Sequence, residues 1–151
     1  MSIQLKLVSF NVLAPAWADP KIYPASSLPY LDRVSRRAVV MAELKELAQS
    51  YDVIGLQETQ IDELPHFTQT LAKQGFSGFS TNHKDSYWAK YITVDPPFAS
   101  NGVALYWRKN KLTVKNISSC DFGKEGNRGI IGEFTLGNKT VRIACVHFDS
   151  D

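Results

Sequence analysis

Residues 51–59, YDVIGLQET, pass from an apolar run into polar residues within a few positions. An apolar run such as 53–56 that ends so abruptly is typical of a buried parallel strand reaching the edge of a sheet. Just before it, DRVSRRAVVMAELKELAQS (32–50) has apolar residues at helical spacing, and Asp32 is a suitable N-cap. The segment 3–12 alternates at first and then becomes densely apolar, which predicts another buried strand. Strand, helix and strand in this order predict a βαβ unit.

The rest of the chain adds one helix and several strands to this unit. The helix is expected from Asp62 or Glu63 to Gln74, because Pro65 suits a first helical turn and Gly75 suits a helix end. The strands are expected over residues 87–94, 102–107, 130–136 and 139–148, the last two forming a hairpin around Gly137 and Asn138. These elements predict an α/β or α+β fold whose second part is mostly antiparallel.

Length and composition fit one globular domain. The 151 residues are 44% hydrophobic and 21% charged, which excludes a disordered chain, and a net charge of +2 is too small to indicate a nucleic-acid or membrane partner by itself. No run approaches the roughly 18 to 20 apolar residues of a membrane helix, and the start MSIQLKL lacks the features of a signal peptide. Cys120 and Cys145 show no zinc-binding spacing. A cytoplasmic protein is therefore expected.

Polar residues follow two of the expected strands, at Asn11 and Glu58. If these strands are parallel neighbours, an amide and a carboxylate meet at one rim of the sheet, where open α/β sheets hold ligands. Oxygen ligands of this kind suit Mg²⁺, which uses one or two carboxylates and keeps waters for a phosphate substrate. The alternative is that Asn11 only begins a loop and Glu58 faces solvent or a helix N-terminus.

His147 ends a third apolar run, and its titration range suits phosphate contact or acid–base chemistry. A structural histidine is the alternative. Asp149 and Asp151 follow it, and a solvated turn is favoured over a metal site for this pair. Asn101 and Gly102 fit a tight turn before a strand.

A group of aromatic residues interleaved with lysines also suggests two interpretations. Such a surface stacks on the bases of single-stranded nucleic acid in some proteins, but aromatic side chains also commonly fill strands. The packing interpretation is favoured for this group, which consists of Lys84, Tyr87, Trp88, Lys90 and Tyr91.

Four stretches together carry a resemblance to a known family: SFNVLAP (9–15), DVIGLQET (52–59), NGVALYWRKNKL (101–112) and VRIACVHFD (141–149). In this order they resemble the first half of the endonuclease/exonuclease/phosphatase superfamily. That group contains pancreatic-type DNases, apurinic endonucleases, inositol-polyphosphate phosphatases and messenger-RNA deadenylases. The pair Arg36 and Arg37 before DVIGLQET adds a likeness to the deadenylase or nocturnin-like branch.

The resemblance implies the N-terminal half of a four-layer α/β/β/α sandwich, with a mixed, largely antiparallel sheet and helices on one face. Residues 1–151 would form one incomplete domain, because the family's later GDxN and SDH motifs have no match in the chain. The chain is therefore expected to be a fragment that needs a C-terminal half and is inactive alone.

The resemblance also assigns roles to individual residues. It implies that Glu58 and Asn11 bind Mg²⁺, or alternatively Mn²⁺, that His147 contacts the scissile phosphate as a catalytic residue beside them, and that Asn101 supports substrate binding. The implied activity is Mg²⁺-dependent phosphodiester hydrolysis by a nuclease acting on RNA or single-stranded nucleic acid. A phosphatase or phospholipid-type diesterase of the same superfamily and a non-catalytic phosphate-binding module are the alternatives.

Overall fold

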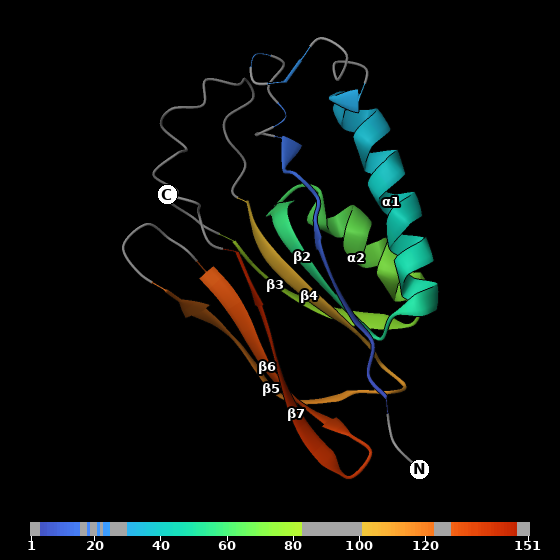
Figure 1. Ribbon diagram of the computed structural model, residues 1–151, viewed down its shortest axis with the longest axis vertical. Helices are drawn as coiled ribbons and strands as arrows, with labels where there is room; N and C mark the ends of the chain where they lie inside the picture. Colours follow the sequence, from blue (N-terminus) through green and yellow to red (C-terminus); the bar gives the residue numbers. More distant parts are fainter. Residues whose placement is uncertain are drawn as a thin grey trace.

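The structure is a computed structural model that describes residues 4–15, 18, 21, 23–24, 30–82, 101–122 and 128–147. The helices and strands form three layers, which are two helices, a four-stranded sheet and a three-stranded sheet (Figure 1). In chain order the elements are β1 (Leu7–Asn11), α1 (Arg33–Ser50), β2 (Val53–Gln60), α2 (Leu64–Lys73), β3 (Phe76–Asn82), β4 (Asn101–Arg108), β5 (Thr113–Asp121), β6 (Arg128–Leu136) and β7 (Lys139–Val146).

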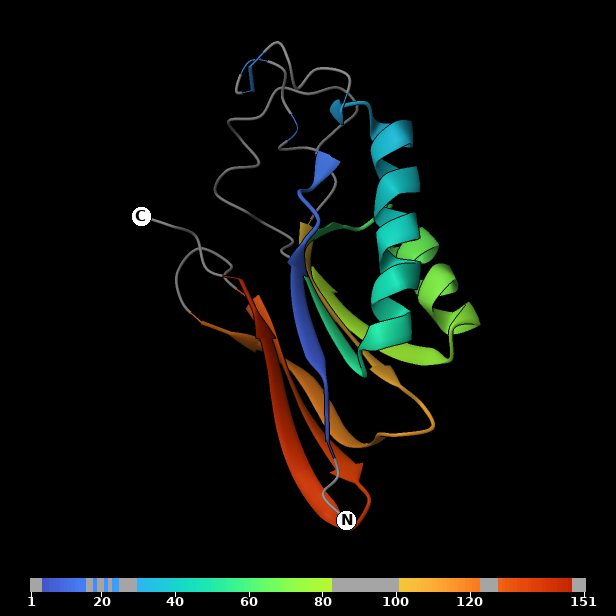
Figure 2. The same cartoon turned by 45° about the vertical axis from the view of Figure 1, so that its right-hand side comes forward.

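The first sheet has the strand order β1-β2-β4-β3 and is mixed. β1 and β2 are parallel, with Asn11 opposite Gln57, and α1 connects them, so the predicted βαβ unit is confirmed. β4 runs antiparallel to both of its neighbours. The second sheet, in the order β5-β6-β7, is antiparallel throughout. Figure 2 shows both helices on one side of the first sheet and the second sheet on its other side.

Helix α1 begins and ends with specific hydrogen bonds. The Asp32 side chain caps the helix by accepting from the Ser35 N–H at 2.8 Å, and this hydrogen bond lowers the pKa of Asp32. At the other end, the Arg108 guanidinium donates to the carbonyl oxygens of Ala48 and Tyr51. None of the helices in the described ranges is long and apolar enough to span a bilayer.

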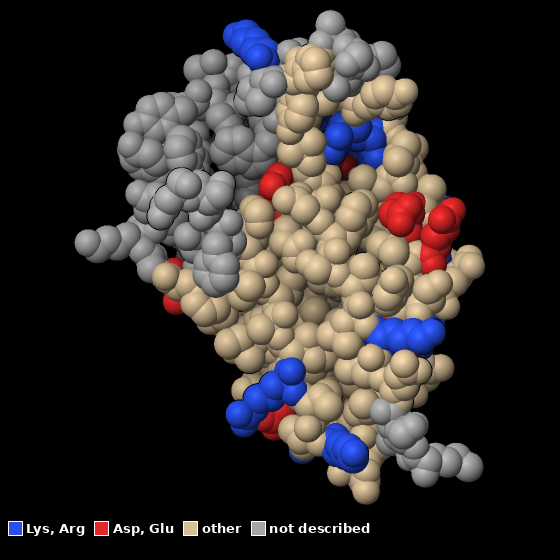
Figure 3. All heavy atoms as spheres, viewed as in Figure 1, with Lys and Arg blue, Asp and Glu red and all other residues tan. Residues whose placement is uncertain are grey.

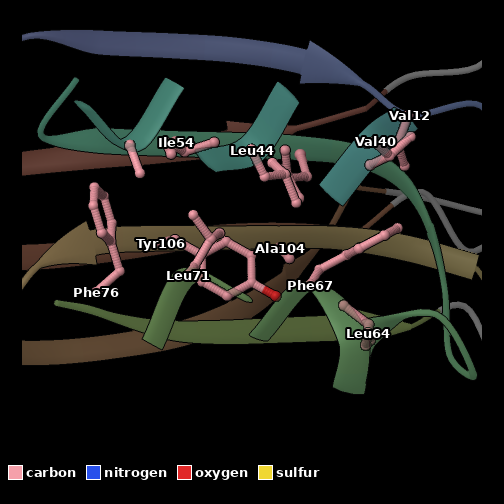
Figure 4. Close-up of a cluster of buried hydrophobic side chains, with 12 residues drawn as sticks. Val12, Val40, Leu44, Ile54, Leu64, Phe67, Leu71, Phe76, Ala104 and Tyr106 are labelled. Atoms are coloured by element: carbon pink, nitrogen blue, oxygen red, sulfur yellow. The ribbon is translucent and has the colours of Figure 1, made fainter. Parts of the chain in front are cut away.

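Two clusters of buried side chains hold the layers together. The first lies between the helices and the first sheet (Figure 4) and includes Leu44, Ile54, Leu71, Phe76 and Tyr106. The second lies between the two sheets and includes Val53, Leu105, Trp107, Ile130 and Phe134. In this second cluster the rings of Trp107 and Phe134 meet edge to face, with centroids 5.2 Å apart. Burial of both faces explains why the first half of β2, residues 53–56, is apolar.

Several boundaries differ from those expected from sequence. β1 is confined to Leu7–Asn11, and α2 begins at Leu64. β2 does not stop at Leu56 but continues to Gln60, because its polar end also pairs with β4. Two strands that the sequence did not predict, β3 and β5, complete the sheets. The expected strand at 87–94 lies outside the described residues.

Candidate functional site

Glu58 is the centre of a polar cluster at the end of β1 and β2. Its carboxylate Oε1 accepts a hydrogen bond of 2.6 Å from Asn11 Nδ2, and its Oε2 accepts one of 3.2 Å from the Ala14 N–H. His147 Nε2 lies 3.5 Å from the same Oε1. The structure therefore brings Asn11, Glu58 and His147 together, although Asn11 and Glu58 are 47 positions apart in the sequence.

The backbone of β2 turns Glu58 toward this cluster. The pairing of β2 with β4 shifts register between Leu56 and Thr59, which is a β-bulge, and Glu58 has a left-handed φ of 56°. Pairing resumes at Thr59, whose hydroxyl donates to the Gly102 carbonyl at 3.1 Å. The Glu58 side chain is 16% exposed, so its charge is partly removed from water. A left-handed glutamate in a bulge is an unfavourable local conformation of the kind that concentrates at functional sites.

Asn11 acts on the cluster through both ends of its side-chain amide. Its Nδ2 donates to Glu58, while its Oδ1 accepts from the Leu13 N–H at 2.8 Å. Leu13 also has a left-handed φ, of 52°. The chain therefore bends back directly after β1 and places the Ala14 N–H against the other oxygen of the carboxylate.

His147 reaches the cluster from the second sheet. It follows β7, which contacts β2 where the Cys145 thiol lies 3.6 Å from Gln57 Nε2 and 3.7 Å from the Leu56 carbonyl. Gly55 permits this approach, since a Cβ there would lie 3.1 Å from Cys145 Sγ. Burial raises the pKa of the Cys145 thiol to about 11, so it remains neutral and serves packing. Asn11 and Glu58 therefore lie on neighbouring parallel strands of one sheet, as expected. His147 follows a strand of the other sheet and contacts Glu58 across the interface between the two sheets.

The other candidate residues are only partly placed. Asn101 is the first residue of β4 and its backbone pairs with Gln60, so Asn101 and Gly102 belong to the strand itself, near Glu58. Nothing in the described part of the chain places its side chain. Asp149, Asp151 and the aromatic and lysine group between 84 and 91 lie outside the described residues.

The described side chains around Glu58 offer few ligands for a divalent cation. Within the described residues, no group of three or more His, Cys, Asp or Glu side chains could enclose a metal. Glu58 nevertheless supplies one carboxylate, and in the part of the chain that the structure describes each of its oxygens accepts one hydrogen bond, from Asn11 or from Ala14, which leaves further lone pairs. A single carboxylate fits Mg²⁺, which keeps several waters and shares substrate phosphate oxygens. Because the Asn11 oxygen faces Leu13, direct ligation by Asn11 stays a prediction.

Arg36 is a further residue of the site, and the sequence indicated it only through the family resemblance. Its Nη2 donates to the carbonyl oxygens of Val12 and Leu13, at 2.9 Å each. A pocket beside the cluster is lined by Leu13, Arg36 and Glu58, among other residues. Figure 3 shows basic side chains gathered at the N-terminal end of α1. Arginine spacing on a helix could not reveal this contact, because it depends on how α1 packs against the end of β1.

The neighbouring arginines of α1 have a different role. Arg33 and Arg37 both form ion pairs with Glu63, at 2.6 Å each, and Arg33 also pairs with Asp62. The Glu63 side chain is only 3% exposed. Burial alone would raise the pKa of Glu63, but hydrogen bonds from Arg37 and Arg33 outweigh it and lower this pKa. These pairs join the start of α2 to α1 next to the site.

Comparison with solved structures defines the class of domain. The structure of ANGEL2, a 2',3'-cyclic phosphatase, matches with a TM-score of 0.77 and 18% identity, over 95% of this chain and 40% of that one. The human Nocturnin catalytic domain with a bound sulfate anion matches with a TM-score of 0.76 and 19% identity, over 97% and 50%. D. rerio TDP2 complexed with a single-strand DNA product gives 0.59 and 13%, over 97% and 47%. The chain thus has their fold and spans half or less of their length.

The sequence comparison gives the family. The chain belongs to the Endonuclease/Exonuclease/phosphatase family, whose model matches residues 8–147. As the family's name states, its enzymes hydrolyse phosphoester bonds. The matched range begins inside β1 and ends at His147, so it includes all three clustered side chains.

Proposed function

We propose that this chain supplies the metal-binding part of a Mg²⁺-dependent phosphodiesterase site that acts on RNA or single-stranded nucleic acid. The observation that carries the proposal is the contact of Asn11, Glu58 and His147 at a strained bulge of β2. One partly buried carboxylate, held by an amide and facing an imidazole, suits a metal ion shared with a phosphate.

Each residue has a distinct part in this proposal. Asn11 Nδ2 and the Ala14 N–H fix the two oxygens of the Glu58 carboxylate. When bound, Mg²⁺ would supply Lewis-acid stabilisation of the charge that develops on the phosphate. His147 Nε2 lies beside that position and would donate a hydrogen bond to a phosphate oxygen during in-line attack by water. Asn101, at the start of β4, would support the substrate.

The substrate class is supported by family membership and by the matched structures. TDP2 was solved with a single-strand DNA product, which agrees with a nucleic-acid substrate. ANGEL2 is a 2',3'-cyclic phosphatase, and this match favours a second candidate, a phosphatase acting on the phosphate at the end of a nucleic acid. Both candidates use the same site and differ in which phosphoester bond is broken.

We also propose that the base that activates the attacking water lies outside these residues. The family's GDxN and SDH motifs have no counterpart in the sequence, and the chain spans 40% to 50% of the two matched structures with the highest TM-scores given above. Residues 1–151 would then bind a divalent cation weakly and hydrolyse nothing at a useful rate. Catalytic groups that act as a unit lose nearly all of their effect when one is missing.

The test combines metal binding with hydrolysis. Purified wild-type chain, Glu58→Gln and the control Glu133→Gln are titrated with Mn²⁺ by electron paramagnetic resonance, with Mg²⁺ competition. Glu133 lies on β6, where it forms an exposed ion pair with Arg142. We expect Glu58→Gln to weaken binding at least about tenfold and Glu133→Gln to leave it unchanged. Equal binding by all three proteins would refute the metal site.

Hydrolysis is measured in the same preparations with labelled oligo(A), single-stranded DNA and a 2',3'-cyclic phosphate end. No Mg²⁺-dependent product above the Glu58→Gln background is expected from residues 1–151. Product that depends on Glu58 would contradict the proposal that the base lies outside residues 1–151. The chemical identity of that product would then distinguish a nuclease from a phosphatase.

A further inference from the structure

We infer that Arg36 is a positioning residue for Glu58, acting through the backbone of segment 12–14. Arg36 does not reach the carboxylate itself. Its guanidinium holds the carbonyl side of two peptide groups whose N–H sides face the candidate site. The geometric part of this inference stands on the contacts alone, and its consequence for metal binding rests on the proposed function.

The peptide group between Leu13 and Ala14 shows the connection. Its C=O accepts from Arg36 Nη2 at 2.9 Å, and its N–H donates to Glu58 Oε2 at 3.2 Å. In a planar trans peptide these two groups point in opposite directions. A donor that fixes the carbonyl therefore also fixes the direction of the N–H, which aims at the carboxylate.

The preceding peptide group, between Val12 and Leu13, is held in the same way. Its C=O accepts from the same Arg36 nitrogen at 2.9 Å, and its N–H donates to Asn11 Oδ1 at 2.8 Å. That hydrogen bond orients the Asn11 amide so that Nδ2 faces Glu58 Oε1. Arg36 thus supports, through two successive peptides, the donors to both oxygens of Glu58.

The segment needs this support because its backbone is strained. Leu13 has a φ of 52°, a left-handed conformation that is unfavourable for a residue with a side chain. Val12 is buried, Ala14 is fully buried, and the Val12 N–H donates to the Gln57 carbonyl at 3.1 Å. These contacts anchor the ends of the segment, while Arg36 binds the two carbonyls that the left-handed residue turns toward α1.

Attachment of α1 does not depend on Arg36. Arg37 and Arg33 pair with Glu63, and Val40 and Leu44 are buried against the first sheet. Among the described residues, Arg36 forms no ion pair, and its guanidinium hydrogen-bonds to the two carbonyls. Replacing it should therefore disturb the segment locally, whereas replacing Arg37 should weaken the packing of the helices.

The first experiment measures amide hydrogen exchange by NMR in wild-type chain, Arg36→Met and the matched control Arg37→Met. Methionine keeps much of the apolar stem and removes the donors. We expect Arg36→Met to speed exchange of the Leu13 and Ala14 amides at least about tenfold relative to Arg37→Met, since hydrogen-bonded amides exchange through local opening. The Leu44 amide of α1 should keep its wild-type rate in Arg36→Met. Unchanged Leu13 and Ala14 rates, or equal acceleration of all amides, would overturn the inference.

The second experiment measures Mn²⁺ affinity in Arg36→Met, Arg36→Lys and Glu58→Gln. Arg36→Met should lose at least about tenfold in affinity, as expected when a residue that orients a ligand is removed, and lysine should restore part of the loss. If Glu58→Gln binds as wild type, the proposed metal site fails, and the exchange result still decides the positioning role. If Glu58→Gln loses affinity and Arg36→Met does not, the positioning role fails and the metal site stands.

Discussion

Replacing Glu58 by glutamine is expected to weaken the fold as well as any metal site. The carboxylate accepts from Asn11 Nδ2 at 2.6 Å and from the Ala14 N–H at 3.2 Å. Glutamine has one oxygen, so its NH₂ group would face one of these two donors. The loss of one hydrogen bond to a charged group costs about 1.5 to 3 kcal/mol. Because the side chain is 16% exposed, water relieves part of the mismatch, and we expect a decrease of about 2 kcal/mol in the free energy of unfolding.

Thermal and urea unfolding at neutral pH, without divalent cations, measure this effect. For a chain of this size about 2 kcal/mol lowers Tm by roughly 4 to 8 °C. Glu133→Gln is the matched control, since its ion pair with Arg142 is exposed and should contribute at most about 0.5 kcal/mol. The reasoning would be refuted if Glu58→Gln unfolded at the same temperature as wild type, or if both variants lost the same stability.

Three further predictions concern the surrounding structure. Because the pKa of Glu63 is lower in the folded state, the ionised side chain stabilises the fold fully above its unfolded pKa of about 4.3, and this stabilisation is lost as the pH falls through the folded-state pKa. In Glu63→Gln, the free energy of unfolding should therefore fall less steeply at acid pH than it does in wild type. Gly55→Ala, which brings a Cβ to 3.1 Å from Cys145 Sγ, should cost about 1 to 3 kcal/mol in urea unfolding. Phe134→Ala, at a fully buried position, should cost about 3 to 5 kcal/mol, and an unchanged urea midpoint would contradict the described packing between the sheets.

Local sequence patterns were sufficient for the βαβ unit and for both helices. The Asp32 cap and the hairpin of β6 and β7 follow from local patterns, and the structure has both of them. The apolar spacing in α1 places Leu44 and Ala48 correctly on the buried face, but Val34 at the start of the helix is exposed. β3 was missed because FSGFSTN has only two large apolar side chains, which is too weak a pattern to predict a strand. Its strand conformation is instead stabilised by backbone pairing with β4. β5 was missed because it is exposed along most of its length at an edge of the second sheet.

The candidate site was predictable in its residues and unpredictable in its geometry. Asn11, Glu58 and His147 were recognisable as polar residues at the ends of apolar runs. No local pattern predicts the left-handed φ of Glu58 or the register shift in β2, because both belong to the way β2 pairs with strands that are distant in the sequence. The contact of Arg36 with segment 12–14 likewise exists only after α1 has packed on the sheet.

The order of contacts along the chain has a consequence for folding kinetics. β5, β6 and β7 are successive antiparallel neighbours, so they can pair after closing only short loops. The cluster around Glu58 joins segments from both ends of the sequence, and such distant contacts form only after a large loss of chain entropy. We therefore expect the Glu58–His147 contact to be absent from the folding transition state. Substitutions at this contact should accelerate unfolding while leaving the refolding rate almost unchanged.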